Sequence, residues 1–169
     1  MNKPALVLDT NVVLDLLHFD DATARPLRHA LEDGRVRCVV SDATLDEWRR
    51  VLAYPEFALG PKQQAALVER YQALSEMAKT VEGDAGLPPK GTPIHDGLSY
   101  PSGWTPVWSR MPRCSDPDDQ KFIELAAAAH AQGLVSKDRA VLKLRRRCVP
   151  YFRIMTPGEA VRWLGDLLA

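Results

Sequence analysis

The chain has 169 residues, with 22 basic and 22 acidic side chains and therefore a formal charge of zero at neutral pH. Its hydrophobic fraction of 46% and charged fraction of 26% are typical of a globular protein. These values exclude a disordered chain, a fibrous repeat and a strongly charged protein that coats nucleic acid. They do not exclude binding to nucleic acid, because such binding depends on where the basic residues lie and not on the net charge. The length predicts one domain over residues 1–169.

The cysteines and the N-terminal residues indicate a reducing compartment. Cys38, Cys114 and Cys148 are widely spaced and form no C-x-x-C pair, so neither a disulfide framework nor a zinc site is expected. Asp9 and Asp15 interrupt the first apolar run, unlike a signal peptide, and no run approaches the roughly 20 apolar residues of a membrane span. We therefore expect a cytoplasmic protein with no membrane partner.

The first half of the chain alternates short apolar runs with helical patterns. Residues 5–8 predict a buried strand, and residues 22–32 predict a helix. A second strand is expected at residues 37–40, followed by helices over residues 45–52 and 61–78, the last with a Pro at its start.

The second half continues the alternation. A helix is expected over residues 117–132, with Gly133 as its stop, and strands over residues 134–136 and 151–155. The last helix begins with a Thr cap and a Pro at its first position and spans residues 156–168. Strands that alternate with amphipathic helices predict an α/β domain with a mainly parallel β-sheet flanked by helices.

Residues 83–112 break this pattern and are interpreted as an insertion. They hold five of the ten glycines and six of the 13 prolines and show no sustained periodicity. The segment also carries Trp104, Trp108, Tyr100 and His95. Its aromatic side chains could stack on unpaired bases, but we favour packing of the insertion against the body of the domain.

Acidic residues follow the expected strands. Asp9 ends the first strand, Glu47 lies about two turns into the helix after the second, and Asp138 follows the third. Ligands of open α/β sheets bind at the carboxyl ends of the strands, where these residues gather. The helix that precedes the third strand adds further carboxylates near its start, at Asp116, Asp118 and Asp119.

Each of these carboxylates also has a structural interpretation. Asp116 and Asp138 could cap the helices that they precede. Glu47 could close a capping box with Thr44, and Asp9 could accept hydrogen bonds from the backbone of a turn. Together, however, carboxylates at one edge repel one another, and a hard cation such as Mg²⁺, which takes oxygen ligands, would compensate them. Such ions can activate water for phosphodiester cleavage.

Four short motifs, in chain order, resemble those of the PIN domain family. The first is the strand that ends in Asp9-Thr10-Asn11, and the second is Glu47 in the helix after the second strand. The third begins at Asp116 and places Asp119 in the register of the family's third acid. The fourth is Ser136-Lys137-Asp138, and the tail at residues 154–159 is similar to one branch of the family.

This resemblance implies a Rossmann-like, three-layer domain and a ribonuclease dependent on Mg²⁺ or Mn²⁺. It implies that Asp9, Glu47, Asp119 and Asp138 are catalytic and surround the metal. Asn11 and Ser136 would be supporting polar groups. Whether Asp116 ligates directly, acts through water or only caps its helix stays open. The branch that shares the tail contains toxin components of type II toxin–antitoxin systems, which adds an antitoxin protein and a homo-oligomer as candidate partners.

A basic run directly follows the fourth acidic motif and predicts a path for RNA, preferably single-stranded. The run contains no acid between residues 139 and 153, and its adjacency to Asp138 favours contacts with the phosphate backbone over a merely solvated helix face. The residues expected to bind nucleic acid are Arg139, Lys143, Arg145, Arg146 and Arg147, with Arg153 at the end of the run.

Two other function classes stay in view. A PIN-like module could have lost catalysis and bind RNA or protein, although the intact acidic set argues against this. A phosphatase of the haloacid-dehalogenase type needs a second Asp two residues after its nucleophile, and that position here is Asn11.

Overall fold

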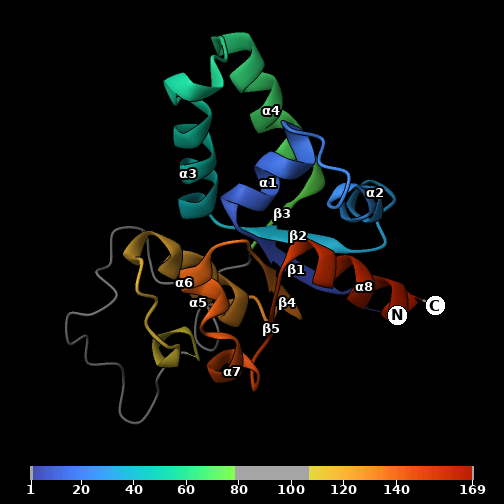
Figure 1. Ribbon diagram of the computed structural model, residues 1–169, viewed down its shortest axis with the longest axis vertical. Coiled ribbons are helices and arrows are strands. Elements are labelled where there is room, and N and C mark those ends of the chain that lie inside the picture. Colours follow the sequence, from blue (N-terminus) through green and yellow to red (C-terminus); the bar gives the residue numbers. More distant parts are fainter. Residues whose placement is uncertain (1, 79–106, 169) are drawn as a thin grey trace.

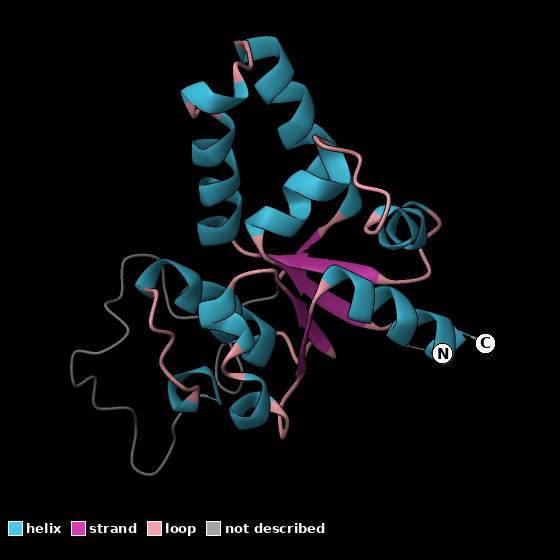
Figure 2. Cartoon of the chain, viewed as in Figure 1, coloured by secondary structure: helices cyan, strands magenta, loops and turns pink. Residues whose placement is uncertain are grey.

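A five-stranded, all-parallel sheet forms the centre of the protein, in a computed structural model that describes residues 2–78 and 107–168 (Figures 1 and 2). The strand order is β3-β2-β1-β4-β5, and β1 pairs with β2 on one side and β4 on the other. The strands are β1 (Ala5–Leu8), β2 (Arg37–Val40), β3 (Glu76–Met77), β4 (Gly133–Val135) and β5 (Arg153–Met155). This confirms the expected α/β fold with a parallel sheet.

Helices cover both faces of the sheet, which gives three layers (Figure 1). All residues of β1 are buried, and because side chains alternate along a strand, Leu6 and Leu8 enter one hydrophobic core while Ala5 and Val7 enter the other. The first face carries α1 (Thr10–Leu17), α2 (Arg25–Glu32), α3 (Asp42–Leu52), α4 (Pro61–Leu74) and α8 (Pro157–Leu168). The second face carries α5 (Gln120–Ala128), α6 (Arg139–Leu142) and α7 (Arg145–Cys148). Three short 3₁₀ turns complete the description, η1 (Pro55–Phe57), η2 (Val107–Arg110) and η3 (Pro117–Asp119).

Two elements differ from the sequence predictions. Helix α1 was not expected, because seven of its eight residues are buried and the segment therefore lacks an amphipathic period. The helix expected over residues 61–78 ends at Leu74, and β3 follows at Glu76–Met77, where the Ala78 N–H donates to the Val40 carbonyl at 2.8 Å. The open edge of β2 therefore pairs with residues whose own sequence carries no strand pattern.

The predicted stop at Gly133 is wrong, since Gly133 lies in β4 and α5 already ends at Ala128. A Cβ at Gly133 would lie 2.6 Å from Met155 Cε and 3.0 Å from Leu6 Cδ2. A side chain here would force Met155 and Leu6 to shift, so close packing between the strands favours a glycine. The boundaries of β1 and β2 are as expected, and the others shift by at most three residues; β4 ends before Ser136, and β5 begins at Arg153.

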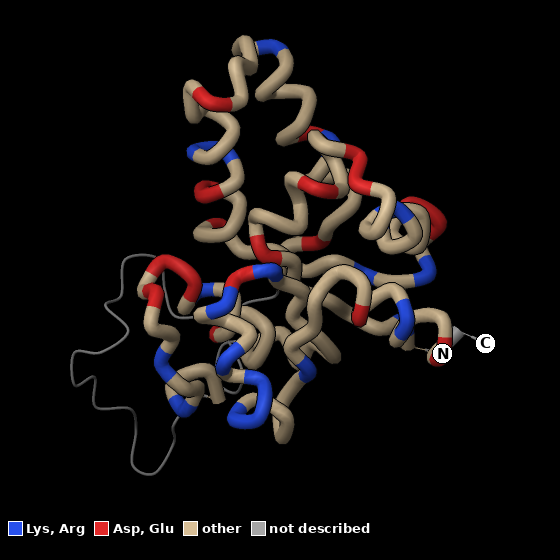
Figure 3. The backbone as a smooth tube through the Cα atoms, viewed as in Figure 1, with Lys and Arg blue, Asp and Glu red and all other residues tan. Residues whose placement is uncertain are grey.

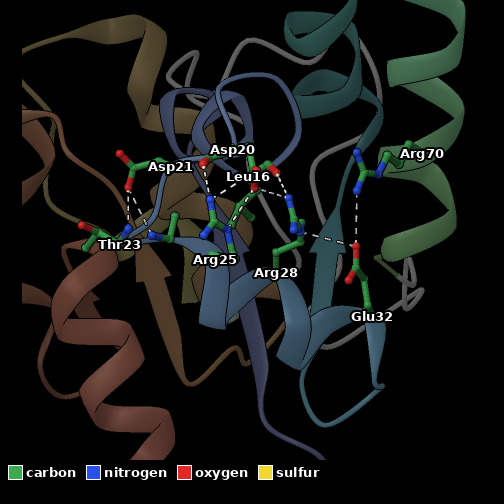
Figure 4. Close-up of polar contacts among 9 residues, drawn as sticks. Leu16, Asp20, Asp21, Thr23, Arg25, Arg28, Glu32 and Arg70 are labelled. Atoms are coloured by element: carbon green, nitrogen blue, oxygen red, sulfur yellow. Dashed lines mark hydrogen bonds and ion pairs between the residues drawn. The ribbon is translucent and has the colours of Figure 1, made fainter.

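Ion pairs connect the end of α1 to α2 and α4 (Figure 4). Asp20, at a positive φ of 50°, accepts from Arg25 and Arg28, and these hydrogen bonds and charges lower the pKa of Asp20. Glu32 pairs with Arg28 at 3.6 Å and with Arg70 at 3.3 Å. The network fixes the outer helices without contributing to the edge of the sheet that is described next.

Part of the expected insertion can be placed. Trp108 in η2 is 4% exposed and belongs to the same core as α5, which agrees with packing against the body. Tyr100, Trp104 and His95 lie outside the described residues. Within residues 2–78 and 107–168, no helix is long and apolar enough to cross a membrane.

Candidate metal centre

The carboxyl ends of β1 and β4 lie side by side where the strand order reverses, the usual ligand site of such sheets. The Asp9 N–H donates to the Val135 carbonyl at 2.9 Å, which joins the two ends. The Asp9 side chain follows directly and is 4% exposed. A carboxylate is thus held among buried groups at the first turn of α1.

Ser136 connects Asp9 to the turn after β4. Its hydroxyl donates to Asp9 Oδ2 at 2.6 Å and accepts from the Asp138 N–H at 3.0 Å, and the residue is fully buried. Asn11 lies beside this bridge, with Nδ2 3.4 Å from Asp9 Oδ2 and Oδ1 3.4 Å from the Lys137 N–H. The two residues expected as polar support therefore contact both the β1 end and the β4 end.

Three further carboxylates gather together, and the charges of two of them, Asp119 and Asp138, interact with that of Asp9. Asp116, Asp119 and Asp138 each offer one oxygen, and these oxygens lie within 4.8 Å of one another. Asp116 and Asp138 also cap their helices, accepting from the N–H groups of Asp118 at 3.0 Å and Ala140 at 2.8 Å. Capping uses one oxygen of each carboxylate, so it does not exclude a ligand role for the other.

Asp119 is the most constrained of the three. It is 8% exposed, and its Oδ2 is buried without a hydrogen-bond partner among the residues that the structure describes. Burial, followed by the charges of Asp9 and Asp138, raises the pKa of Asp119 to about 8. Burial also raises the pKa of Asp9 to about 6; the hydrogen bond from Ser136 opposes this shift. The edge therefore holds more negative charge than its own donors satisfy.

Glu47 lies near these groups but has partners of its own. Its Oε1 is 2.7 Å from Lys121 Nζ and 3.7 Å from Arg50 Nη2, and its Oε2 accepts from the Thr10 hydroxyl. The capping box suggested for Glu47 is wrong, because α3 is capped by Ser41, whose side chain exchanges bonds with Thr44. Glu47 is not among the three carboxylates whose oxygens gather within 4.8 Å.

A second lysine is paired at the same edge. Lys137 Nζ lies 2.7 Å from Asp15 Oδ2. Asp15 is on α1, one turn after Asn11. The lysine side chain is 47% exposed and the aspartate side chain 11%. Two of the acids near the sheet edge, Asp15 and Glu47, are thus compensated by lysines, whereas Asp9 and Asp119 have no ion-pair partner among residues 2–78 and 107–168.

The basic run lies on α6 and α7, next to the turn that carries Asp138 (Figures 1 and 3). Five of its members are exposed, namely Arg139, Lys143, Arg146, Arg147 and, at the start of β5, Arg153. Arg145 differs, because its Nη2 lies 2.6 Å from Glu159 Oε1 at the start of α8. Arg145 is therefore partly engaged in joining α7 to α8.

Sequence reasoning assigned no role to Thr10 and Lys121, although both contact Glu47. One signal for Lys121 was available: a cation in the first turn of a helix opposes the helix dipole, so its presence there points to an anionic neighbour. Thr10 gave no such signal, because threonine is common in the first turn of a helix.

One comparison with known proteins gives a match. The sequence profile of a family described as PIN domain matches residues 5–140, a span that runs from β1 into α6 and includes every carboxylate of the cluster. No curated protein and no solved structure matches the chain.

Proposed function

The chain belongs to the PIN domain family of metal-dependent nucleases, and we propose that it is an endoribonuclease that uses Mg²⁺ or Mn²⁺ to hydrolyse phosphodiester bonds of single-stranded RNA. The observation that carries the proposal is the buried Oδ2 of Asp119, which has no hydrogen-bond partner in the described part of the chain and belongs to a carboxylate beside those of Asp116 and Asp138. A hard divalent cation satisfies such oxygens and lowers the pKa values that burial and the neighbouring charges have raised.

The donor set fits this kind of ion, since it consists of carboxylate oxygens and carries no thiolate or imidazole. Asp119, Asp138 and Asp9 would hold the ion, with Asp116 as a further ligand. A bound ion of this kind supplies positive charge that activates water and stabilises the phosphate oxygens during hydrolysis.

The residues around the cluster would prepare it for substrate. Ser136 donates to Asp9 and accepts from the Asp138 N–H, which fixes two of the carboxylates relative to each other. Arg139, Lys143 and the neighbouring arginines of α7 would hold the phosphate backbone, since phosphate contacts supply most of the nonspecific affinity for nucleic acid. The ion pair with Glu159 makes Arg145 the weakest contributor of this group.

We further propose that the nuclease is the toxin of a toxin–antitoxin pair and acts in the cytoplasm. The support is the resemblance of residues 154–159 to that branch of the family. In the structure this tail is the end of β5 and the capped start of α8, where the Thr156 hydroxyl donates to Glu159 Oε1 at 2.8 Å. Growth arrest on expression of the wild-type chain, absent for Asp9→Asn, would support the toxin role, and unimpaired growth with active enzyme would oppose it.

Cleavage of end-labelled single-stranded RNA, with a duplex of the same sequence as comparison, tests the enzymatic proposal. Wild-type protein should cleave the single strand with Mg²⁺ or Mn²⁺ and should stop when EDTA is added. Asp9→Asn and Asp119→Asn should reduce cleavage by about 100-fold or more, because each removes a charge from the metal centre.

Asp118→Asn is the matched control, since it makes the same change at an exposed residue of the same turn. It should retain most of the activity. Wild-type cleavage rates in Asp9→Asn and Asp119→Asn would contradict the site. RNA binding without cleavage by the wild-type chain would instead indicate a non-catalytic binding module.

A further inference from the structure

We propose that Lys121 is a positioning residue of the metal centre, and that Glu47, its ion-pair partner, orients the centre through Lys121 without ligating the metal. The inference rests on the proposed metal-dependent function, which it deepens. Lys121 Nζ lies 2.7 Å from Glu47 Oε1 and 2.6 Å from the Asp118 carbonyl oxygen, and the side chain is 22% exposed. One ammonium group therefore bridges α3 and the η3 turn.

The two contacts of Lys121 tie together the halves of the acidic cluster. On one side, the Asp118 carbonyl belongs to the turn that carries Asp116 and Asp119. On the other side, Glu47 accepts from the hydroxyl of Thr10, the residue next to Asp9. The resulting chain of contacts runs from the η3 turn through Lys121 and Glu47 to the end of β1. It therefore fixes the separation between Asp9 and the carboxylates of η3.

The partners of Glu47 argue against a ligand role. Both of its carboxylate oxygens are already engaged, Oε1 by Lys121 with Arg50 at 3.7 Å, and Oε2 by Thr10. Asp119 is the contrasting case, because its Oδ2 is buried with no partner in the described part of the chain. Asp119 thus offers a buried oxygen that a metal cation could contact, whereas the oxygens of Glu47 already contact the ammonium group of Lys121 and the hydroxyl of Thr10.

Lys121 lies where two electrostatic effects disfavour a cation. Its removal therefore distinguishes a role in positioning from a role in balancing charge. Lys121 is in the first turn of α5, where the helix dipole disfavours a cation. It also places a positive charge near a centre proposed to bind a divalent cation. Electrostatics alone therefore predicts that removal of this charge raises metal affinity, whereas loss of a positioning contact predicts the opposite sign.

Titration of the metal-free protein with Mn²⁺, followed by electron paramagnetic resonance of the unbound ion, measures this sign directly. Lys121→Gln should weaken Mn²⁺ binding by about 10- to 100-fold, the range found when groups that orient metal ligands are removed. Lys121→Arg keeps the charge and a donor for Glu47 and should recover most of the affinity. Glu47→Gln should weaken binding less than Asp119→Asn does, and Glu47→Gln/Lys121→Gln should lose no more than the worse single variant.

Lys137→Gln is the control for charge, because it removes a second ion-paired lysine from the same edge without breaking the bridge between α3 and η3. It should leave Mn²⁺ affinity unchanged or slightly higher. Lys121→Met, which keeps the unbranched stem, repeats the test if Lys121→Gln does not fold, with thermal unfolding in EDTA as the check of folding.

A gain of Mn²⁺ affinity in Lys121→Gln or Lys121→Met would overturn the inference, as would a loss in Glu47→Gln equal to that in Asp119→Asn. These outcomes leave the proposed function standing. Failure of the wild-type protein to bind Mn²⁺, or unchanged binding in Asp119→Asn, would instead reject the metal centre itself.

Discussion

Replacement of Asp9 by Asn should stabilise the metal-free protein while it removes metal binding. Burial raises the pKa of Asp9 from its ordinary value of 3.8 to about 6 in the folded protein. A raised pKa means that the folded state disfavours the charged form, so the destabilisation is present above the folded pKa and absent below the unfolded one. A difference of about two pKa units corresponds to roughly 3 kcal/mol at most, of which about 1–3 kcal/mol should be recovered by a neutral amide of the same shape.

The environment of Asp9 can accommodate this change. The Ser136 hydroxyl, which donates to Asp9 Oδ2, can donate equally to the amide oxygen of an asparagine. The amide also removes one of the negative charges that raise the pKa of Asp119. The fold should therefore tolerate the substitution, because the amide has the shape of the carboxylate and keeps an acceptor for Ser136.

Thermal unfolding in EDTA at two pH values is the assay. Near pH 8, Asp9→Asn should unfold about 2–12 °C above the wild type, given about 1–3 kcal/mol of recovered stability and roughly 2–4 °C per kcal/mol for a chain of this size. The difference should shrink as the pH falls from the folded pKa of about 6 toward the unfolded value of 3.8, and near pH 4 it should be small, because folded Asp9 is then protonated and the unfolded carboxyl is only partly ionised. Added Mg²⁺ should raise the melting temperature of the wild type only, since stabilisation by a ligand requires binding to the folded state.

A lower melting temperature of Asp9→Asn at the higher pH in EDTA would refute the reasoning, and so would a difference that does not change with pH. Asp118→Asn serves as the control, because Asp118 is exposed and the same charge is removed from solvent. It should change the melting temperature little at either pH.

Three further predictions concern the centre, the sheet and the basic surface. Mn²⁺ affinity should rise as the pH increases through about 8 and then level off. The reason is that burial and neighbouring charges raise the pKa of Asp119 to about 8, and metal binding requires the deprotonated carboxylate. Mn²⁺ titrations across this pH range check the prediction, and an affinity that does not change with pH would contradict it. Gly133→Ala should lower the free energy of unfolding in denaturant by about 1–3 kcal/mol, because the added methyl group overpacks the core. Gly165→Ala is the control, since this glycine lies in a helix with nothing near the added Cβ, and it should be neutral or stabilising by up to about 1 kcal/mol. Equal effects of the two substitutions would refute the packing argument. Arg146→Gln/Arg147→Gln should weaken binding of single-stranded RNA and reduce the slope of log affinity against log salt by about 0.7 for each lost phosphate contact; an unchanged slope would place the RNA elsewhere.

Local patterns predicted the parallel sheet and four of its five strands. Residues 5–8 and 37–40 are β1 and β2 with the boundaries expected from sequence, because short buried runs flanked by capping residues have few alternatives. The position of Asp9 and Asp138 after strands followed from the same patterns, since parallel strands end at one edge. The ligand roles of these residues, and the single-domain assignment, stay predictions.

Other elements depended on contacts between distant segments. The strand β3 contains only Glu76 and Met77, both exposed, and exists because the edge of β2 offers backbone partners. Gly133 is favoured because the side chains of Met155 and Leu6, from the two neighbouring strands, lie where its Cβ would be. A local stretch of sequence predicts neither feature, because the residues that contact β3 and Gly133 lie far away in the chain.

The sequence by itself determined that several carboxylates gather at one edge of a parallel sheet in a chain with no net charge. Only the tertiary structure decided which of them are compensated. Lys121 and Lys137 pair with Glu47 and Asp15 across helices that are distant in the chain. Asp119 is left with a buried oxygen that lacks a donor in the described structure. The reason is that ion pairing depends on separations of a few ångströms, which strand and helix patterns do not specify.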